Sequence, residues 1–241
     1  MRHRWFGSFV AGLMLQACAK ESVIQTPTMI SVLTKDSTAS TTAQELLRTE
    51  SGRLTGNANL LEPVVRVSSR LIAAARRSEY GSRARNLCWV VAVYDDPAKP
   101  RAFVRPDGGI VVSTAMFRLA ETEAGLAALL GHELAHALTS ETVPGLPPCV
   151  SMGEQPNTLH TYEEELQADE IGLTLMAGAG YDPRELLRLW ERLRLQEKVG
   201  DHVLEHFTYE RRMEHIAQRL PPALMRYERA NRAPQKKLPL K

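Results

Sequence analysis

The sequence predicts an α+β fold that is mainly helical and carries a small β-sheet. Several long segments repeat apolar residues at helical spacing, and three short segments rich in β-branched residues lie close together in the chain. The 241 residues suffice for one domain with some spare length. Hydrophobic residues make up 44% and charged residues 24%, which excludes a disordered, collagen-like or disulfide-dense chain. The net charge of +2 argues against nucleic acid as a partner.

The predicted sheet has strands at about residues 87–94, 102–105 and 109–114. The first is a run of Cys, Trp, Val and Ala ended by the turn-forming Asp95-Asp96-Pro97. The second and third flank Asp107-Gly108, whose turn chemistry predicts a hairpin.

The predicted helices alternate with short polar or Pro-containing stretches. Thr122 is a suitable N-cap for the second helix, and Pro183 suits the first turn of the fourth. Pro221 and Pro222 predict that the last helix ends and that residues 221–241 form a partly ordered tail. The expected helices are 62–77, 123–138, 162–179, 183–199 and 209–220.

The first residues have the pattern of an export signal. Residues 1–17 combine a basic start, a short apolar run and a small Ala17, typical of a signal peptide. Leu15-Gln16-Ala17-Cys18 resembles the bacterial lipoprotein cleavage box, so we expect a lipid on Cys18 and a membrane anchor, with residues 18–42 as anchor and flexible tether. The residue after Cys18 is Ala19 and not an aspartate, which favours the outer over the inner membrane. The expected localisation is therefore the bacterial cell envelope, at the periplasmic face of the outer membrane. The alternative is an ordinary secretory leader with a free Cys18.

Two further cysteines follow, Cys88 and Cys149. In an oxidising compartment two remaining thiols can pair, so a disulfide between them is one prediction. Two separate buried thiols are the other.

The strongest motif is His132-Glu133-Leu134-Ala135-His136, an HExxH sequence within a helical context. Residues i and i+4 share a helix face, so both imidazoles can bind one zinc ion. Glu133 is rotated by about 100° from His132, where it can take a proton from an attacking water. The alternative is a pair of structural histidines beside a solvated glutamate.

A third ligand is expected in Glu165-Leu166-Gln167-Ala168-Asp169. A catalytic zinc ion uses three protein ligands, and Glu165 would complete the set. Asp169, one turn further, could accept the outer N–H of a zinc-binding histidine. Small Ala168 and Gly172 on the same face would let the two helices approach closely. Alternatively, the acidic residues form only a solvated face.

With these motifs, the chain resembles the gluzincin metallopeptidases that include the HtpX-like, BepA-like and type I CAAX prenyl proteases. The resemblance covers about residues 62–220 of an expected metallopeptidase domain at 43–220. It includes 102–110, the helix 125–138 with HExxH, the ExxAD segment with Gly172, and 179–183. The resemblance implies a zincin-type fold with the sheet beside the HExxH helix, one zinc ion per chain, ligands His132, His136 and Glu165, and Glu133 as catalytic base.

The same family carries a His-Pro followed by an arginine near the end of the domain, and the counterpart here is His206-Phe207 with Arg212. The resemblance implies that His206 reaches the metal, either as a latency ligand or as an oxyanion stabiliser, and that Arg212 orients the substrate carbonyl or a nearby carboxylate. Phe207 in place of Pro departs from the pattern, and the alternative is that it reshapes the segment and leaves His206 as a surface residue. The span of only 29 positions from His136 to Glu165 also departs from the pattern and predicts a reduced lid.

Together these features predict a zinc metalloendopeptidase that cleaves unfolded or misassembled cell-envelope polypeptides, with strand 109–114 holding an extended substrate. The alternative is a lipid-anchored, chaperone-like binding protein that keeps a zinc site and cleaves little. We expect His160, His202 and His215 at the surface and Trp89 and Trp190 in the core.

Overall fold

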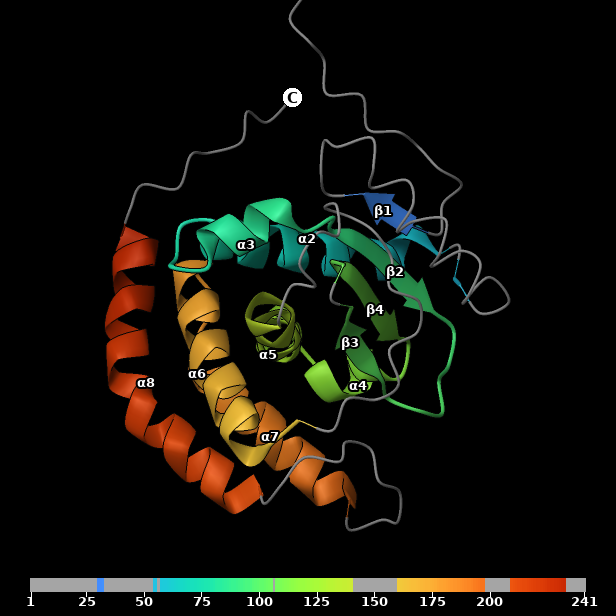
Figure 1. The fold of residues 1–241 in the computed structure, drawn as a ribbon. Helices are drawn as coiled ribbons and strands as arrows, with labels where there is room; N and C mark the ends of the chain where they lie inside the picture. The colour runs from blue at the N-terminus through green and yellow to red at the C-terminus, as the bar shows by residue number, and fades with distance from the viewer. Residues whose placement is uncertain are drawn as a thin grey trace, which may run out of the picture.

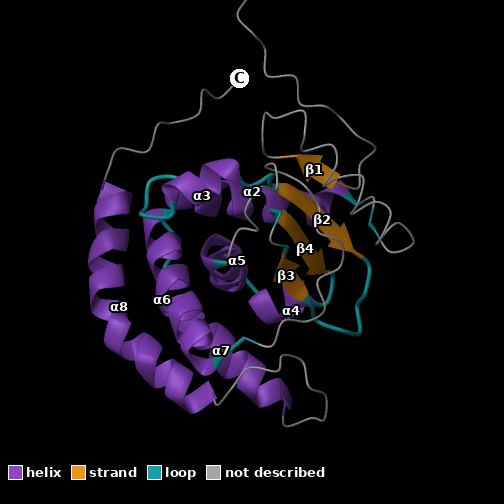
Figure 2. Ribbon diagram, in the orientation of Figure 1, coloured by secondary structure: helices purple, strands orange, loops and turns teal. Residues whose placement is uncertain are grey.

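The computed structural model describes residues 30–32, 54–55, 57–105, 107–140, 160–197 and 209–232. Helices form most of this part of the chain, and the strands gather in one sheet at its side (Figure 2). The predicted fold class, α+β and mainly helical, is confirmed.

The sheet contains β1 (Ile30–Val32), β2 (Val90–Tyr94), β3 (Ala102–Val104) and β4 (Gly109–Ser113), in the order β1-β2-β4-β3. β2 and β4 are parallel, and β3 is antiparallel to β4, which confirms the predicted hairpin. β4 has a strand on each side, so its backbone groups are already paired. In the described part of the chain, β3 is the last strand at its edge of the sheet.

β1 lies inside residues 18–42, which we expected to form a tether. Ile30–Val32 pair antiparallel with Val90–Ala92 of β2. The expectation is wrong at these three residues, because backbone pairing at the open edge of β2 outweighs the polar composition around them. A strand this short carries too little alternation to be recognised from sequence. The other residues of 18–42 lie outside the described part.

The predicted helices are all present among the described residues, with two additional short ones. α5 occupies the middle of the molecule and is seen nearly end-on between the sheet and α6 (Figure 1). Every residue of α5 from 125 to 138 is buried, as expected for a helix with small or apolar residues around its whole circumference. Thr122 caps α5 as predicted, accepting a hydrogen bond from the Gly125 N–H at 3.0 Å. The helices are α2 (Ala58–Ala75), α3 (Gly81–Asn86), α4 (Met116–Ala120), α5 (Glu123–Thr139), α6 (Tyr162–Gly178), α7 (Arg184–Glu197) and α8 (Tyr209–Arg232).

α8 extends twelve residues further than predicted, through Pro221 and Pro222. A proline inside a helix removes a backbone hydrogen bond and costs about 3 kcal/mol. Burial compensates here: Ile216 and Ala223 are buried and lie on one face, where α8 packs along α6 (Figure 1). The expected tail is therefore helical as far as Arg232, and the remaining residues lie outside the described part.

The turn between β3 and β4 depends on Gly108. Its φ is 102°, and a Cβ atom there would lie 2.7 Å from the Cys88 carbonyl oxygen, so only glycine fits. The Asp107 carboxylate accepts the N–H of Gly109 at 3.1 Å. This is the Asp-Gly turn that the sequence predicts.

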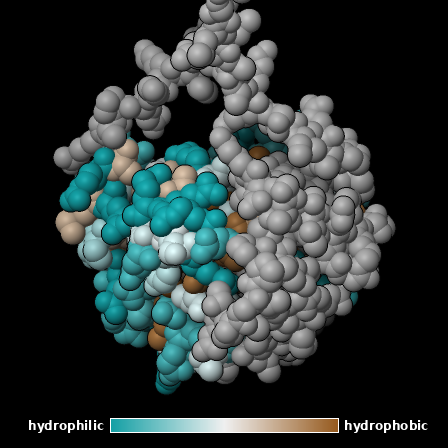
Figure 3. Space-filling view, turned by 45° about the horizontal axis from the view of Figure 1, so that its top comes forward, coloured by the Kyte–Doolittle hydropathy of each residue, from teal (hydrophilic) through white to brown (hydrophobic). Residues whose placement is uncertain are grey.

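The surface formed by the described residues is mostly hydrophilic in the space-filling view, with small separate hydrophobic spots (Figure 3). Among the described residues, no helix has the length and apolar character needed to cross a membrane.

Candidate metal centre

Three side chains converge where α5 meets the first turn of α6. The two imidazole Nε2 atoms of His132 and His136 are 3.2 Å apart. One carboxylate oxygen of Glu165 lies 3.4 Å from His132 Nε2, and the other lies 3.3 Å from His136 Nε2. All three residues are buried. The structure thus brings together the three residues that the HExxH and ExxAD spacings predict as a ligand set.

These distances fit a tetrahedral zinc ion. Three ligand atoms that each lie about 2.0–2.1 Å from one tetrahedral metal are separated from each other by about 3.3–3.4 Å. Two imidazoles and a carboxylate also form one of the usual ligand sets of catalytic zinc, which keeps a fourth position open. His132, His136 and Glu165 could therefore hold a metal ion without rearrangement.

Two glycines let α5 and α6 approach closely enough to form this group. A Cβ atom added at Gly172 would lie 3.1 Å from the backbone nitrogen of His132. One added at Gly131 would lie 3.2 Å from the Gly172 carbonyl oxygen. Both values are shorter than ordinary contacts, so the close approach predicted from Gly172 is observed.

Asp169 supports the centre from inside. Its Oδ1 atom is 3.1 Å from His132 Nδ1 and also accepts the indole N–H of Trp190 at 3.1 Å. With Nε2 of His132 turned toward the ligand group, Nδ1 carries the proton and donates to Asp169, as in histidines that bind metals. The contact predicted for Asp169 is present.

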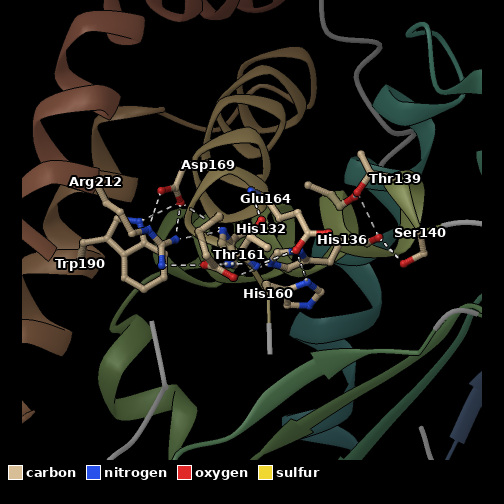
Figure 4. Close-up of polar contacts among 12 residues, drawn as sticks. His132, His136, Thr139, Ser140, His160, Thr161, Glu164, Asp169, Trp190 and Arg212 are labelled. Carbon is tan, nitrogen blue, oxygen red and sulfur yellow. Dashed lines mark hydrogen bonds and ion pairs between the residues drawn. The ribbon is translucent and has the colours of Figure 1, made fainter. Parts of the chain in front are cut away.

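Arg212 enters the same network from α8. It donates to Asp169 through Nε at 2.8 Å and Nη2 at 2.7 Å, and its Nη1 is 2.7 Å from Glu165 Oε2. Its side chain is fully buried and its guanidinium lies 4.0 Å from the centre of the Trp190 ring (Figure 4). Of the two predicted roles, the structure places Arg212 on carboxylates. A direct contact with a substrate carbonyl is not compatible with this position, because the side chain is fully buried behind the two carboxylates.

His160 lies on the opposite side of the centre and was expected only at the surface. Its ring stacks on the ring of His136 with the centroids 3.8 Å apart and 13° between the planes. It directly precedes Thr161, the N-cap of α6, and its Nδ1 is 3.7 Å from Glu164, the other half of the capping box. His160 and Trp190 are the contacts that sequence reasoning missed. The capping box could have indicated that the chain turns into α6 beside the ligands, but it does not specify the stack.

The electrostatics of the two histidines differ. Burial alone would lower the pKa of His132, but hydrogen bonds to Asp169 and Glu165 outweigh it and raise the pKa to about 9. Burial dominates at His136 and lowers its pKa to about 4. The surroundings of His132 thus favour a positive charge, which a proton or a metal ion can supply, while His136 is held neutral, as a metal ligand must be.

The two carboxylates beside the ligands also differ. Burial raises the pKa of Glu133 to about 7. Burial also acts to raise the pKa of Asp169, but Arg212 and His132 outweigh it and hold that pKa below its ordinary value. Asp169 is therefore negatively charged at neutral pH, whereas Glu133 gains and loses its proton near neutral pH.

Three other predicted site residues lie outside the described part of the chain. These are His206, Cys18 and Cys149. Cys88 is disulfide-bonded. Its pairing with Cys149, the lipid on Cys18 and the role of His206 stay predictions.

Comparison with known proteins agrees with this site. Residues 62–146, which include the HExxH helix, match the model of peptidase family M48. The chain thus carries a domain of peptidase family M48, whose members are zinc-dependent, and the three converging ligands fit that metal. The family predicted from the HExxH and ExxAD segments is confirmed.

Three curated relatives are mitochondrial metalloendopeptidases named OMA1. The chain is 27% identical over 173 residues to the protein of Saccharomyces cerevisiae, which covers 59% of this chain and 50% of the relative. The chain is 29% identical over 170 residues to the protein of Arabidopsis thaliana, which covers 61% of this chain and 35% of the relative. It is 29% identical over 191 residues to the protein of Schizosaccharomyces pombe, which covers 68% of this chain and 54% of the relative. The chain therefore spans about half the length of these relatives, or less.

These relatives overturn the predicted localisation. The leader suggested the periplasmic face of a bacterial outer membrane, whereas the matching metalloendopeptidases are mitochondrial proteins. That prediction is wrong. A leader pattern is short and compositional, and it carries less information than a match over most of the domain.

Proposed function

We propose that this chain is a zinc-dependent metalloendopeptidase in which His132, His136 and Glu165 hold the metal and Glu133 is the catalytic base. The observation that carries this proposal is the convergence of the three ligand side chains at 3.2–3.4 Å between α6 and α5, the helix that also presents Glu133. A zinc site with only a structural role would have no need of that glutamate. The names of the relatives support the same activity.

The residues would divide the work of peptide hydrolysis. Zinc, when bound, supplies a Lewis acid that polarises the scissile carbonyl group. Glu133, with a pKa near 7, takes a proton from the attacking water and returns it to the leaving amine. Asp169 keeps His132 in the tautomer whose Nε2 faces the ligand group. Arg212 pairs with both buried carboxylates and offsets part of their charge.

The strand that pairs with the substrate differs from the one that the sequence predicts. Strand 109–114 was expected to pair with an extended polypeptide, but β4 is enclosed by β2 and β3. We propose that the edge of β3 takes this role, because it is the last strand in the described sheet and packs beside α5. Phe103 on β3 is exposed and could contact a substrate side chain. Unfolded polypeptides fit such an edge because their backbone groups are free to pair.

The proposal is tested by removing the metal and restoring it. The full chain is incubated with an unfolded protein such as casein, before and after treatment with a zinc chelator and then with added zinc. We expect cleavage to stop with the chelator and to return with zinc. Cleavage that persists in the metal-free chain would exclude a zinc mechanism, and absence of cleavage in the zinc-loaded chain would favour the binding-protein alternative.

A further inference from the structure

The Asp169 carboxylate has four donor atoms around it, and three of them come from helices that carry no ligand: Trp190 on α7 and Arg212 on α8. His132 Nδ1, Trp190 Nε1 and Arg212 Nη2 surround Oδ1 at 3.1, 3.1 and 2.7 Å, and Arg212 Nε donates to Oδ2 at 2.8 Å. A carboxylate can accept about four hydrogen bonds. Trp190 thus supplies the contact that links α7 to the carboxylate orienting His132.

The ring of Trp190 makes two further contacts with the same network. Its face lies 4.0 Å from the guanidinium carbon of Arg212, and it meets the His132 ring edge-on with centroids 5.2 Å apart. A guanidinium stacks through its face and donates hydrogen bonds through its edge. Trp190 can therefore fix the plane of Arg212 while every N–H directed at Asp169 and Glu165 remains available.

The second buried tryptophan shows what a purely structural indole does in this fold. Trp89 is fully buried, and its indole N–H donates to the carbonyl oxygen of Ala84, five residues earlier, at 2.8 Å. Trp190 is buried to the same degree, but its indole N–H goes to a charged carboxylate that contacts a ligand histidine. The two residues thus differ in the partner that each indole supports.

We propose that Trp190 is a positioning residue of the metal centre. Through its N–H it holds Asp169, and through its ring it holds Arg212, so that the His132 ring keeps the orientation in which Nε2 faces Glu165 and His136. This inference rests on the proposed ligand set and extends it to α7. Docking of α7 then becomes a condition for tight metal binding.

The test compares Trp190→Phe with the matched variant Trp89→Phe, each in the full chain. Both changes remove one buried indole hydrogen bond and keep an aromatic ring. Zinc affinity is measured by competition with a chromophoric chelator, and the absorption spectrum is recorded with cobalt in place of zinc. We expect Trp190→Phe to weaken zinc binding by about tenfold, at the low end of the range for residues that orient metal ligands, and to change the cobalt spectrum.

Trp89→Phe is expected to lower the unfolding temperature while leaving zinc affinity and the cobalt spectrum unchanged. Wild-type affinity in Trp190→Phe, or an equal loss in both variants, would overturn the proposal. If Trp190→Phe does not fold, the indole N–H resonances of the unmodified chain are followed during zinc titration. The Trp190 resonance should shift and that of Trp89 should not, and an unmoved Trp190 would contradict the role.

These readouts do not need proteolysis. If the zinc affinity depends on Trp190 but the zinc-loaded chain cleaves nothing, the positioning role stands and the proposed function is refuted. If the chain cleaves peptides but the two variants bind zinc equally well, the proposed function stands and the positioning role of Trp190 is refuted.

Discussion

The two sides of the candidate metal centre are built in different ways. On the inner side, Asp169, Arg212 and Trp190 are at most 1% exposed and form a closed set of hydrogen bonds and stacking contacts. On the outer side, His136 and Glu133 are each 8% exposed, and the His160 side chain is 32% exposed. Figure 4 shows the inner group and the His136–His160 stack at opposite ends of the site.

This difference separates two requirements of a catalytic centre. Charges taken out of water must be paired, and a fully paired network can set the geometry of the ligands without solvent. Groups that meet a substrate must instead stay reachable. Substitutions of the inner residues should therefore reduce stability and metal affinity, whereas substitution of Glu133 on the outer side should act on activity.

The largest expected effect is the loss of peptide cleavage on substitution of Glu133, which leaves the contacts of the inner side unchanged. In Glu133→Gln an amide replaces the carboxylate and cannot accept the proton of the attacking water, so cleavage should fall by about 10²–10⁴-fold. The bound zinc and the unfolding temperature should stay close to wild type. Peptide cleavage and metal content, measured on the same preparation, check this prediction.

The matched variants for Glu133→Gln are His136→Ala and Glu165→Ala, which remove ligands. Both should lose zinc as well as cleavage. Unchanged cleavage in Glu133→Gln would remove Glu133 from the mechanism, and full zinc content in Glu165→Ala would remove Glu165 from the ligand set.

The part of the centre on α5 and α6 could be predicted because its geometry is local. His132 and His136 share a face by helical spacing, and Asp169 follows Glu165 by one turn of the same helix. The contacts of Trp190 could not be predicted in this way. Its helix carries no motif, and its indole meets Asp169 only because α7 packs against α5.

α8 carries a buried and a half-exposed arginine, and each of the two pairs with a carboxylate. Arg212→Met leaves the carboxylates of Asp169 and Glu165 buried without their cation, which should cost about 3–5 kcal/mol of the free energy of unfolding. Arg219, whose side chain is 50% exposed and which pairs with Glu170 at 3.3 Å, is the control. Arg219→Met should cost less than about 1 kcal/mol.

Urea unfolding of both arginine variants, with zinc and with a chelator, measures these costs. The difference between the variants should persist in the metal-free chain, because the carboxylates are buried whether or not a cation is bound. Equal losses in Arg212→Met and Arg219→Met would show that burial does not distinguish the two ion pairs.

A smaller effect is expected where α5 and α6 touch. Gly172→Ala places a Cβ atom 3.1 Å from the backbone nitrogen of His132, so the helices must separate slightly. Overpacking of this kind costs about 1–3 kcal/mol, and it should also weaken zinc binding because Glu165 moves with α6. Gly178→Ala is the control at the end of the same helix, where the added Cβ atom would meet Ala74 at an ordinary 3.4 Å.

Thermal unfolding and zinc competition measured on both glycine variants decide this point. Gly178→Ala should keep wild-type zinc affinity and gain up to about 1 kcal/mol, since alanine loses less backbone entropy in a helix. A Gly172→Ala chain as stable and as tightly binding as Gly178→Ala would mean that the close approach is not needed.

The sequence also misses features whose partners are distant in the chain or whose elements are short. β1 is recognisable only through its pairing with β2, and α8 continues through two prolines only because its apolar face is covered by α6. In both cases tertiary contacts outweigh a local preference. The fold class and the convergence of His132, His136 and Glu165 depend on long, regular segments, and for that reason the sequence could predict them.

The smallest expected effect lies on the outer side, at His160. Its ring covers one face of the His136 ring at 3.8 Å, and an aromatic pair contributes about 0.5–1.5 kcal/mol. In His160→Ala the unfolding temperature should fall only slightly and zinc binding should weaken a few-fold, by about 0.5 kcal/mol, because His136 loses the stacked ring that limits its motion. His160→Phe keeps a flat ring and should restore zinc affinity, whereas a histidine that acts through its ion pair with Glu164 would not be replaced by Phe. Zinc competition and peptide cleavage on both variants distinguish these cases. If His160→Phe resembles His160→Ala in zinc affinity, the stack does not support His136, and the outer side contributes to metal binding through charge.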